Sequence, residues 1–319
     1  VGSTRRSPRS TPMSAPREVV VDALGREVPA GEAGRVVSLV PSETESVVLL
    51  GGLDRLAGRT DYCVEPPEVA AAPSIGGTKN VDVDAVVDLR PDLVLANQEE
   101  NTKTAVEALI ARGLRVHVSF PRTVDQSVAH LADLARLLGL DPEAHPLVAE
   151  VREAFREADA ARARGLPGRD LVGVFVPVWK DPWMTFDGRA FASDLLELSG
   201  FRNVFSDRPR RYPLAADLGR RAPLSADRVG DRDTRYPRVS LAEVRDRNPS
   251  ILLLPDEPYA FDEAGRTALL QEPLLSGTPW VTRRERVRLV SGRDLFWYGV
   301  HLRTSLPALR RLRAAVASV

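Results

Sequence analysis

The feature of this sequence that most constrains its fold is a repeated alternation of short apolar runs with helical segments. Strands are indicated at 35–40, 92–96, 114–118, 171–176, 251–254 and 287–290, and helices at 42–50, 102–112, 123–138, 190–198, 241–247 and 303–316. The apolar runs are nearly continuous, which is typical of strands that are buried on both faces. Strands that alternate with helices form right-handed βαβ units around a parallel sheet. The sequence therefore predicts an α/β protein with two Rossmann-like lobes.

A longer helical segment lies between the two series of strands. Residues 146–164 place Leu147, Val151, Phe155 and Ala158 on one face. At about 1.5 Å per residue, this helix spans roughly 30 Å, which is long enough to bridge two lobes. The predicted domains are a disordered extension at 1–18, a first lobe at 19–141, a connecting backbone helix at 142–168 and a second lobe at 169–319.

The second lobe contains an unusual segment at 206–238. Its residues 210–217 are echoed at 220–227, and the whole segment holds nine arginines, five aspartates and little apolar mass. This composition favours a mobile surface insertion. A patch for nucleic acid or phosphate is the alternative, which the interleaved aspartates argue against.

Charge and cysteine content exclude several classes of protein. The 44 basic and 44 acidic residues give a formal net charge of zero, so no net positive field attracts nucleic acid or an anionic membrane. Cys63 is the only cysteine, which rules out a disulfide framework. Residues 1–17 contain no apolar run of the kind found in export signals. We therefore expect a cytoplasmic protein as the chain is written, and an extracytoplasmic one if a signal has been removed.

Ligands of open parallel sheets bind beyond the carboxyl ends of the strands, so the loops at those ends are the candidate site. The loop residues that stand out are Ser42, Glu43, Asn97, Glu100, Arg122, Trp179, Trp183, Tyr259, Trp297 and Tyr298. Three of the four tryptophans fall in these loops. Aromatic rings at the mouth of a cleft offer flat apolar contact area, although such rings can also cover the edge of the lobe's own core.

Signatures of catalysis and of metal binding are missing. The sequence contains no GxSxG, HExxH or GxGxxG pattern, and its carboxylates and four histidines have no common spacing. We expect His117 in the core and His130 and His145 at the surface, and only His301 is a candidate ligand. The glycine-rich turn at 76–80 does not match a phosphate-binding loop, but it presents Lys79 and Asn80. No metal site and no resident cofactor are predicted.

The chain resembles the class III, or helical-backbone, substrate-binding proteins of ABC importers, which are receptors for iron-siderophores, haem and cobalamin. The resemblance rests on RVVSLVPSETE at 35–45, GGL at 51–53, IGG at 75–77, LRPDLVLA at 89–96 and NPSILLL at 248–254. It covers about residues 19–319 apart from the insertion. Exported members of the family carry a signal peptide and often a lipid-anchored cysteine, neither of which is present in this sequence.

The resemblance implies two lobes joined by one rigid helix, with little domain motion and a ligand held between the lobes. The ligand would be a cobalamin-like corrinoid or a metal chelate, the partner an ABC importer permease, and the protein a monomer that binds no nucleic acid. The ligand contacts implied are Ser42, Glu43, Tyr62, Lys79, Asn80, Asn97, Glu100, Arg122, Trp179, Trp183 and Tyr298, to which the loop positions add Tyr259 and Trp297.

Two other functions remain open from the sequence. The same fold could serve in the cytoplasm as a carrier or sensor of a corrinoid or metal chelate. An enzyme acting in the interlobe cleft, with Glu43, Glu99 or Glu100 as its base, is the third possibility; it requires a carboxylate with a perturbed pKa, which a sequence does not reveal.

Overall fold

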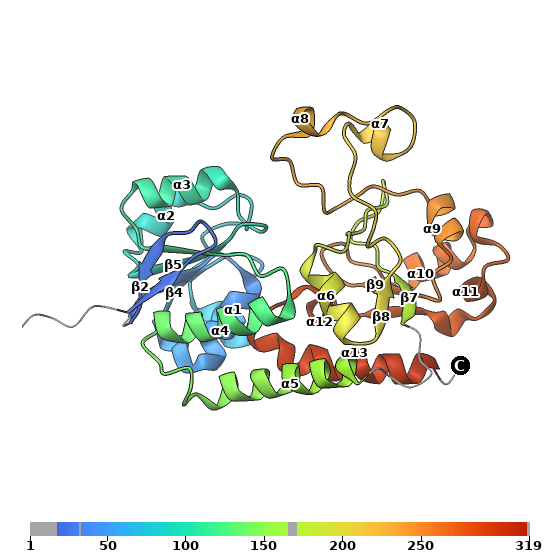
Figure 1. Cartoon of the computed structure of the whole chain (residues 1–319). Coiled ribbons are helices and arrows are strands. Elements are labelled where there is room, and N and C mark those ends of the chain that lie inside the picture. The colour runs from blue at the N-terminus through green and yellow to red at the C-terminus, as the bar shows by residue number, and fades with distance from the viewer. Residues whose placement is uncertain (1–17, 32, 165–170, 318–319) are drawn as a thin grey trace, which may run out of the picture.

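The computed structural model describes residues 18–31, 33–164 and 171–317, so the predicted N-terminal extension lies almost entirely outside the described residues (Figure 1). The described chain forms two four-stranded parallel sheets, each flanked by helices. A small antiparallel hairpin, β1 (Val19–Val21) and β2 (Glu27–Pro29), precedes the first sheet. The predicted architecture of two α/β lobes is confirmed.

The first sheet has the strand order β4-β3-β5-β6. Its strands are β3 (Val36–Ser38), β4 (Leu56–Arg59), β5 (Leu93–Asn97) and β6 (Val116–Ser119). Its helices are α1 (Pro41–Val47), α2 (Val83–Asp88), α3 (Lys103–Ala111) and α4 (Val124–Leu137). Every residue of β3, β5 and β6 is buried, as the continuous apolar runs predicted. The short strand β4 was not predicted; a Cβ at its Gly58 would lie 2.6 Å from Leu89 Cδ1, so a larger residue there would displace that side chain.

The second sheet has the strand order β10-β9-β7-β8. Its strands are β7 (Val172–Phe175), β8 (Phe201–Asn203), β9 (Ile251–Pro255) and β10 (Val287–Val290). Around it lie α6 (Phe191–Leu198), α9 (Leu241–Arg247), α10 (Glu263–Leu270), α11 (Pro279–Thr282) and α12 (Arg293–Phe296). All its pairings are parallel. The three-residue strand β8 and the helix α10 were not predicted.

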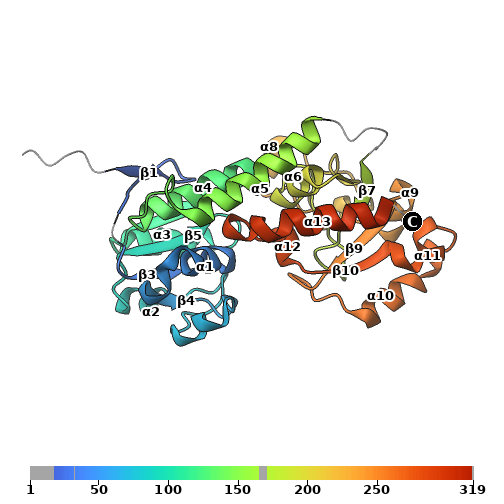
Figure 2. The ribbon, with the colours of Figure 1, turned by 90° about the horizontal axis from the view of Figure 1, so that it is seen from below.

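Two long helices run along one side of both lobes. The chain passes from the first sheet to the second through α5 (Pro146–Ala163), and α13 (Leu302–Ala317) packs beside it (Figure 2). One apolar core includes Leu131 of α4, Val151 of α5, Leu195 of α6 and Leu306 of α13, so it continues from one lobe into the other. A shared, close-packed core holds the lobes in one relative position. The division of the chain at 141/142 and 168/169 stays a prediction, since residues 165–170 lie outside the described residues.

The insertion at 206–238 has a folded base and an exposed outer part. Two short helices, α7 (Leu214–Asp217) and α8 (Ala226–Val229), project from the second lobe on the side away from α5 (Figure 1). At the base, Arg208 and Asp217 form an ion pair at 2.9 Å with both side chains at most 4% exposed. The surface position was expected, but this buried pair was not.

Two local predictions are wrong. Helix α1 begins at Pro41 with Val40 as its N-cap and ends at Val47, rather than running from 42 to 50. Proline fits the first helical position because the N–H it lacks would be unbonded there. His130, expected at the surface, is only 8% exposed, because it shares the buried face of α4 with Ser127 and Leu134. None of the described helices combines the length and the apolar character needed to cross a membrane.

Candidate functional site

The carboxyl ends of the two sheets face each other where the lobes meet. Glu65, which follows β4, pairs with Arg293, which follows β10, at 2.8 Å. Glu99, which follows β5, lies 3.3 Å from Arg235 of the second lobe. The loops after β4 and β5 of the first lobe therefore contact the second lobe.

A cavity of about 300 Å³ lies at the β6–β8 end of the junction. Arg122 and Gln126 line it from the first lobe, and Arg189, Asn203 and other polar residues line it from the second. Its volume is at the lower limit of small-molecule sites. Of the predicted contacts, it includes Arg122, which is exposed.

A buried polar cluster joins the lobes beside the strand ends. Tyr298 of the second lobe donates a hydrogen bond to Glu43 Oε1 at 2.9 Å, and its hydroxyl lies 3.0 Å from both Asn97 Nδ2 and Ser119 Oγ. Ser119 also donates to Glu43 Oε1. None of these four side chains is more than 7% exposed. We call Glu43, Asn97, Ser119, Tyr298, His117 and His130 the junction cluster.

The two histidines of the junction cluster affect the pKa of its carboxylate, Glu43. His130 Nε2 lies 3.3 Å from Glu43 Oε1, and the rings of His130 and His117 stack with centroids 5.5 Å apart. Burial alone would raise the pKa of Glu43, but its contacts with His130, His117 and Ser119 outweigh burial and lower that pKa. Burial, followed by the nearby His130, lowers the pKa of His117 to about 4. Burial, followed by the charge of Glu43, raises the pKa of Tyr298 well above its usual value. The cluster is therefore a buried carboxylate held by hydrogen-bond donors from both lobes.

His301 makes a further ionic contact between the lobes. Its Nδ1 lies 3.1 Å from Glu45 of α1, and its Nε2 lies 3.3 Å from Asp294 of α12. Burial opposes the charged ring, but the two carboxylates prevail and raise the pKa of His301 to about 9. His301 was the one candidate ligand among the histidines of the sequence. In the structure it is an imidazolium that joins two lobes.

Four aromatic rings form a row on the second lobe beyond β7 and β9. Trp179 meets Tyr259 edge-on at 5.5 Å, Tyr259 lies 4.7 Å from Phe261, and Phe261 stacks on Trp183 at 5.9 Å. Trp179 is 46% exposed, whereas Tyr259 and Trp183 are half-buried against the apolar core of this lobe. Trp183 thus covers the core of its own lobe, whereas Trp179 reaches solvent and its contact with a ligand stays a prediction.

Two carboxylates with raised pKa values lie on opposite lobes near these loops. Burial raises the pKa of Glu100, an effect that Lys79 counteracts and that Glu99 and Glu257 reinforce. Burial also raises the pKa of Glu257, against contacts with Trp297 and Arg293. Because Glu100 follows β5 and Glu257 follows β9, the pair offers hydrogen-bonding groups from both lobes to the same region.

The remaining predicted contacts occupy different environments. Tyr62, Lys79 and Asn80 are exposed, and Lys79 Nζ donates to the carbonyl oxygen of Glu99. Ser42 is 3% exposed inside α1, and Trp297 is 7% exposed with Arg293 5.2 Å from its ring centroid. The structure thus places Ser42, Glu43, Asn97, Trp297 and Tyr298 in the packed junction, and a role for any of them in ligand contact stays a prediction.

Sequence reasoning missed several residues that join the lobes. His130 could have been found, because 127, 130, 134 and 137 follow the helical period on the apolar face of α4. Arg235 and Tyr236 carried no such signal, because they lie in an arginine-rich segment whose apolar residues follow neither the helical nor the strand period. Within the described part of the chain, no three His, Cys, Asp or Glu side chains gather as they would around a metal ion.

Comparison with known proteins gives consistent results. The vitamin B12-binding protein of Yersinia pseudotuberculosis is 26% identical over 240 residues, which is 75% of this chain and 76% of that protein. The periplasmic vitamin B12 binding protein BtuF of Vibrio cholerae has the same fold, with a TM-score of 0.68 and 17% identity over 91% of this chain and all of that one. A periplasmic heme binding protein from Pseudomonas aeruginosa gives a TM-score of 0.69 with 21% identity, covering 88% of this chain and 92% of that one.

The family comparison covers nearly the whole of the two lobes. Residues 36–290, from the start of β3 to the end of β10, match the family described as periplasmic binding protein. The matched region includes both sheets and the connecting helix α5, and it ends before Arg293, Trp297 and Tyr298. The relatives named above are binding proteins rather than enzymes. The chain therefore belongs to the periplasmic binding protein family.

Proposed function

We propose that this chain is a non-catalytic binding protein that holds a cobalamin-like corrinoid or another metal chelate, such as haem or a ferric siderophore, between its two lobes. Membership of the periplasmic binding protein family supports this function, as do relatives named for vitamin B12 and heme binding. The observation that carries the proposal is the row of aromatic rings on the second lobe, placed at strand ends that face polar loops of the first.

The chemistry of these loops suits a large, flat, partly apolar ligand. Trp179 and Tyr259 offer ring surface against a macrocycle, and apolar contact of this kind contributes most of the affinity in such sites. On the first lobe, Tyr62, Lys79 and Asn80 are exposed and can bind polar groups at the rim of the ligand. Glu100 has a raised pKa and can accept hydrogen bonds from amide side chains of a corrinoid.

The shared core supports binding without a large conformational change. The junction cluster and the packing of α5 against α13 limit how far the lobes can move before any ligand arrives. A preformed site loses little conformational entropy on binding, so more of the contact energy appears as affinity. We further propose that the protein acts as a monomer and delivers its ligand to an ABC importer permease.

Titration of the purified full chain with cyanocobalamin, haemin and a ferric siderophore tests the ligand class. Tryptophan fluorescence reports on Trp179, which is half exposed, and the same ligands without metal serve as controls. We expect saturable 1:1 binding of at least one of the three metal-containing compounds at micromolar concentration or below. Failure of all three to bind would refute the proposed ligand class.

A further inference from the structure

The end of the insertion reaches across to the first lobe. Arg235 Nη1 lies 3.3 Å from Glu99 Oε2, and the Tyr236 hydroxyl donates a hydrogen bond to Glu99 Oε1. The guanidinium of Arg235 also lies over the ring of Phe120, 4.7 Å from its centroid. Glu99 and Phe120 follow the neighbouring strands β5 and β6. Two consecutive residues of one lobe therefore contact two loops of the other.

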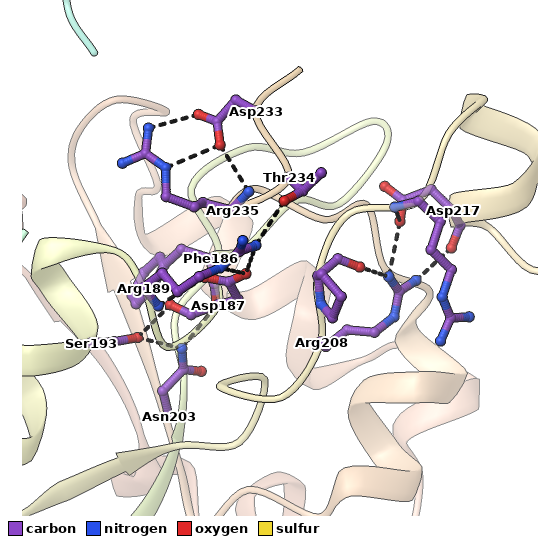
Figure 3. A network of polar contacts seen from close by, with 12 residues as sticks. Phe186, Asp187, Arg189, Ser193, Asn203, Arg208, Asp217, Asp233, Thr234 and Arg235 are labelled. Atoms are coloured by element: carbon purple, nitrogen blue, oxygen red, sulfur yellow. Dashed lines mark hydrogen bonds and ion pairs between the residues drawn. The ribbon is translucent and has the colours of Figure 1, made fainter. Parts of the chain in front are cut away.

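The segment that supplies these residues is fixed to its own lobe. The backbone N–H of Asp187 donates to the carbonyl oxygen of Arg235 at 2.8 Å, and Arg189 donates to Thr234 Oγ1 at 2.8 Å (Figure 3). Asp233 holds the guanidinium of Arg235 through two bonds of 3.0 and 2.8 Å (Figure 3). The side chain is thus oriented before it meets Glu99, so little rotamer entropy is lost in the contact.

Glu99 is likewise held in place by hydrogen bonds within the first lobe. Its backbone N–H donates to Asn97 Oδ1 at 2.7 Å, and its carbonyl oxygen accepts a bond from Lys79 Nζ. Burial, then the charge of Glu99, raises the pKa of Tyr236 well above its usual value, so the phenol keeps its proton and remains a donor. Hydrogen bonds to a carboxylate are about twice as strong as neutral ones.

These contacts lie beside the interlobe cavity. Arg189, which bonds Thr234, lines that cavity, and so does Arg122, whose guanidinium is 5.8 Å from the centroid of the Phe120 ring. On the opposite side of the molecule, α5 and α13 join the lobes through apolar core (Figure 2). The contact at Glu99 is polar and partly exposed, with Glu99 26% and Arg235 13% accessible, so it can break without unfolding either lobe.

We propose that residues 233–238 form a strap that ties the second lobe to Glu99 of the first lobe, and that the strap must release Glu99 before a bound ligand can leave. The release of ligand rests on the proposed function; the tie between the lobes does not. The strap gives the otherwise exposed insertion a structural role, because its base is held by Arg208 and Asp217 while its end faces the other lobe.

Distance measurements by pulsed electron spin resonance test the strap without any ligand. Spin labels at Lys103→Cys on α3 and Leu274→Cys on the second lobe are both at exposed positions, and the native Cys63 is fully buried. We expect Glu99→Gln and Tyr236→Phe each to broaden the interlobe distance distribution. Glu68→Gln, an exposed carboxylate of the first lobe, is the matched control and should leave the distribution narrow. Distributions identical to wild type in both strap variants would overturn the strap.

Ligand dissociation tests the second half of the proposal. We expect Glu99→Gln to release a bound corrinoid or haem about tenfold faster than wild type in stopped-flow experiments, as the loss of a charge-assisted contact predicts. An unchanged release rate alongside a broadened distance distribution would overturn the gating role. If wild type binds none of the chelates, the proposed function fails, and the distance measurement still decides whether the strap exists.

Discussion

Replacing Tyr298 with Phe removes a single oxygen atom from the centre of the lobe junction. The hydroxyl donates to Glu43 at 2.9 Å and lies 3.0 Å from Asn97 and Ser119. The ring itself is held by edge-on contacts with His130 and Phe191, with centroids 5.6 and 6.3 Å away. Phe preserves these contacts, so the substitution isolates the hydrogen bond.

The expected loss follows from the environment of Glu43. A hydrogen bond to a charged group contributes about 1.5–3 kcal/mol, because removing the donor leaves the charge buried. Glu43 is 1% exposed, and its Oε2 has no hydrogen-bond partner within the described residues, so the carboxylate depends on its Oε1, to which Tyr298 and Ser119 donate and from which His130 lies 3.3 Å away. We therefore expect Tyr298→Phe to lower the free energy of unfolding by about 2–3 kcal/mol.

Urea denaturation followed by far-UV circular dichroism measures this change. Tyr62→Phe is the matched control, because Tyr62 is 63% exposed, and it should change the free energy of unfolding by less than about 0.5 kcal/mol. If Tyr298→Phe were also within that margin of wild type, the junction cluster would not hold the lobes together as described.

Three further predictions concern other parts of the molecule. Trp179→Ala should weaken ligand binding by about 1–3 kcal/mol in a titration, whereas Leu274→Ala, which is exposed and outside the aromatic row, should not. The pKa of His301 is raised from 6.5 to about 9, so the protonated ring adds about 3 kcal/mol at most to the free energy of unfolding. This contribution is complete below pH 6.5 and is lost as pH rises through 9. His301→Gln should therefore flatten this part of the curve of unfolding free energy against pH. Arg208→Ala leaves Asp217 buried without its ion-pair partner, so limited trypsin digestion should cleave the insertion faster than in wild type.

Much of the architecture was predictable because the pattern of apolar residues within a short stretch of sequence indicates which strands and helices are buried. The continuous apolar runs around Val36, Leu93 and Val116 mark strands buried on both faces, and the 3.6-residue period marks α4 and α5. Strands β4 and β8 escaped prediction because Gly58 and Arg202 interrupt their apolar runs.

The candidate site was predictable only in part, because it depends on contacts between lobes. The rule that ligands bind at strand ends selected Trp179, Trp183 and Tyr259, which the structure brings together in one aromatic row. The same rule selected Glu43, Asn97 and Tyr298, which hydrogen-bond to one another across 201 and 255 residues of sequence. Nothing in a sequence distinguishes a strand-end residue that faces a ligand from one that faces the other lobe.

The most direct test of the account is a crystal structure of the chain with the metal chelate that binds in the titration. The account predicts that the chelate lies between the lobes, with one face against the ring of Trp179 or Tyr259 and its rim near Lys79, Asn80 or Glu100. A chelate bound outside the junction, or on a single lobe away from these loops, would contradict the claim that the facing strand ends form the binding site.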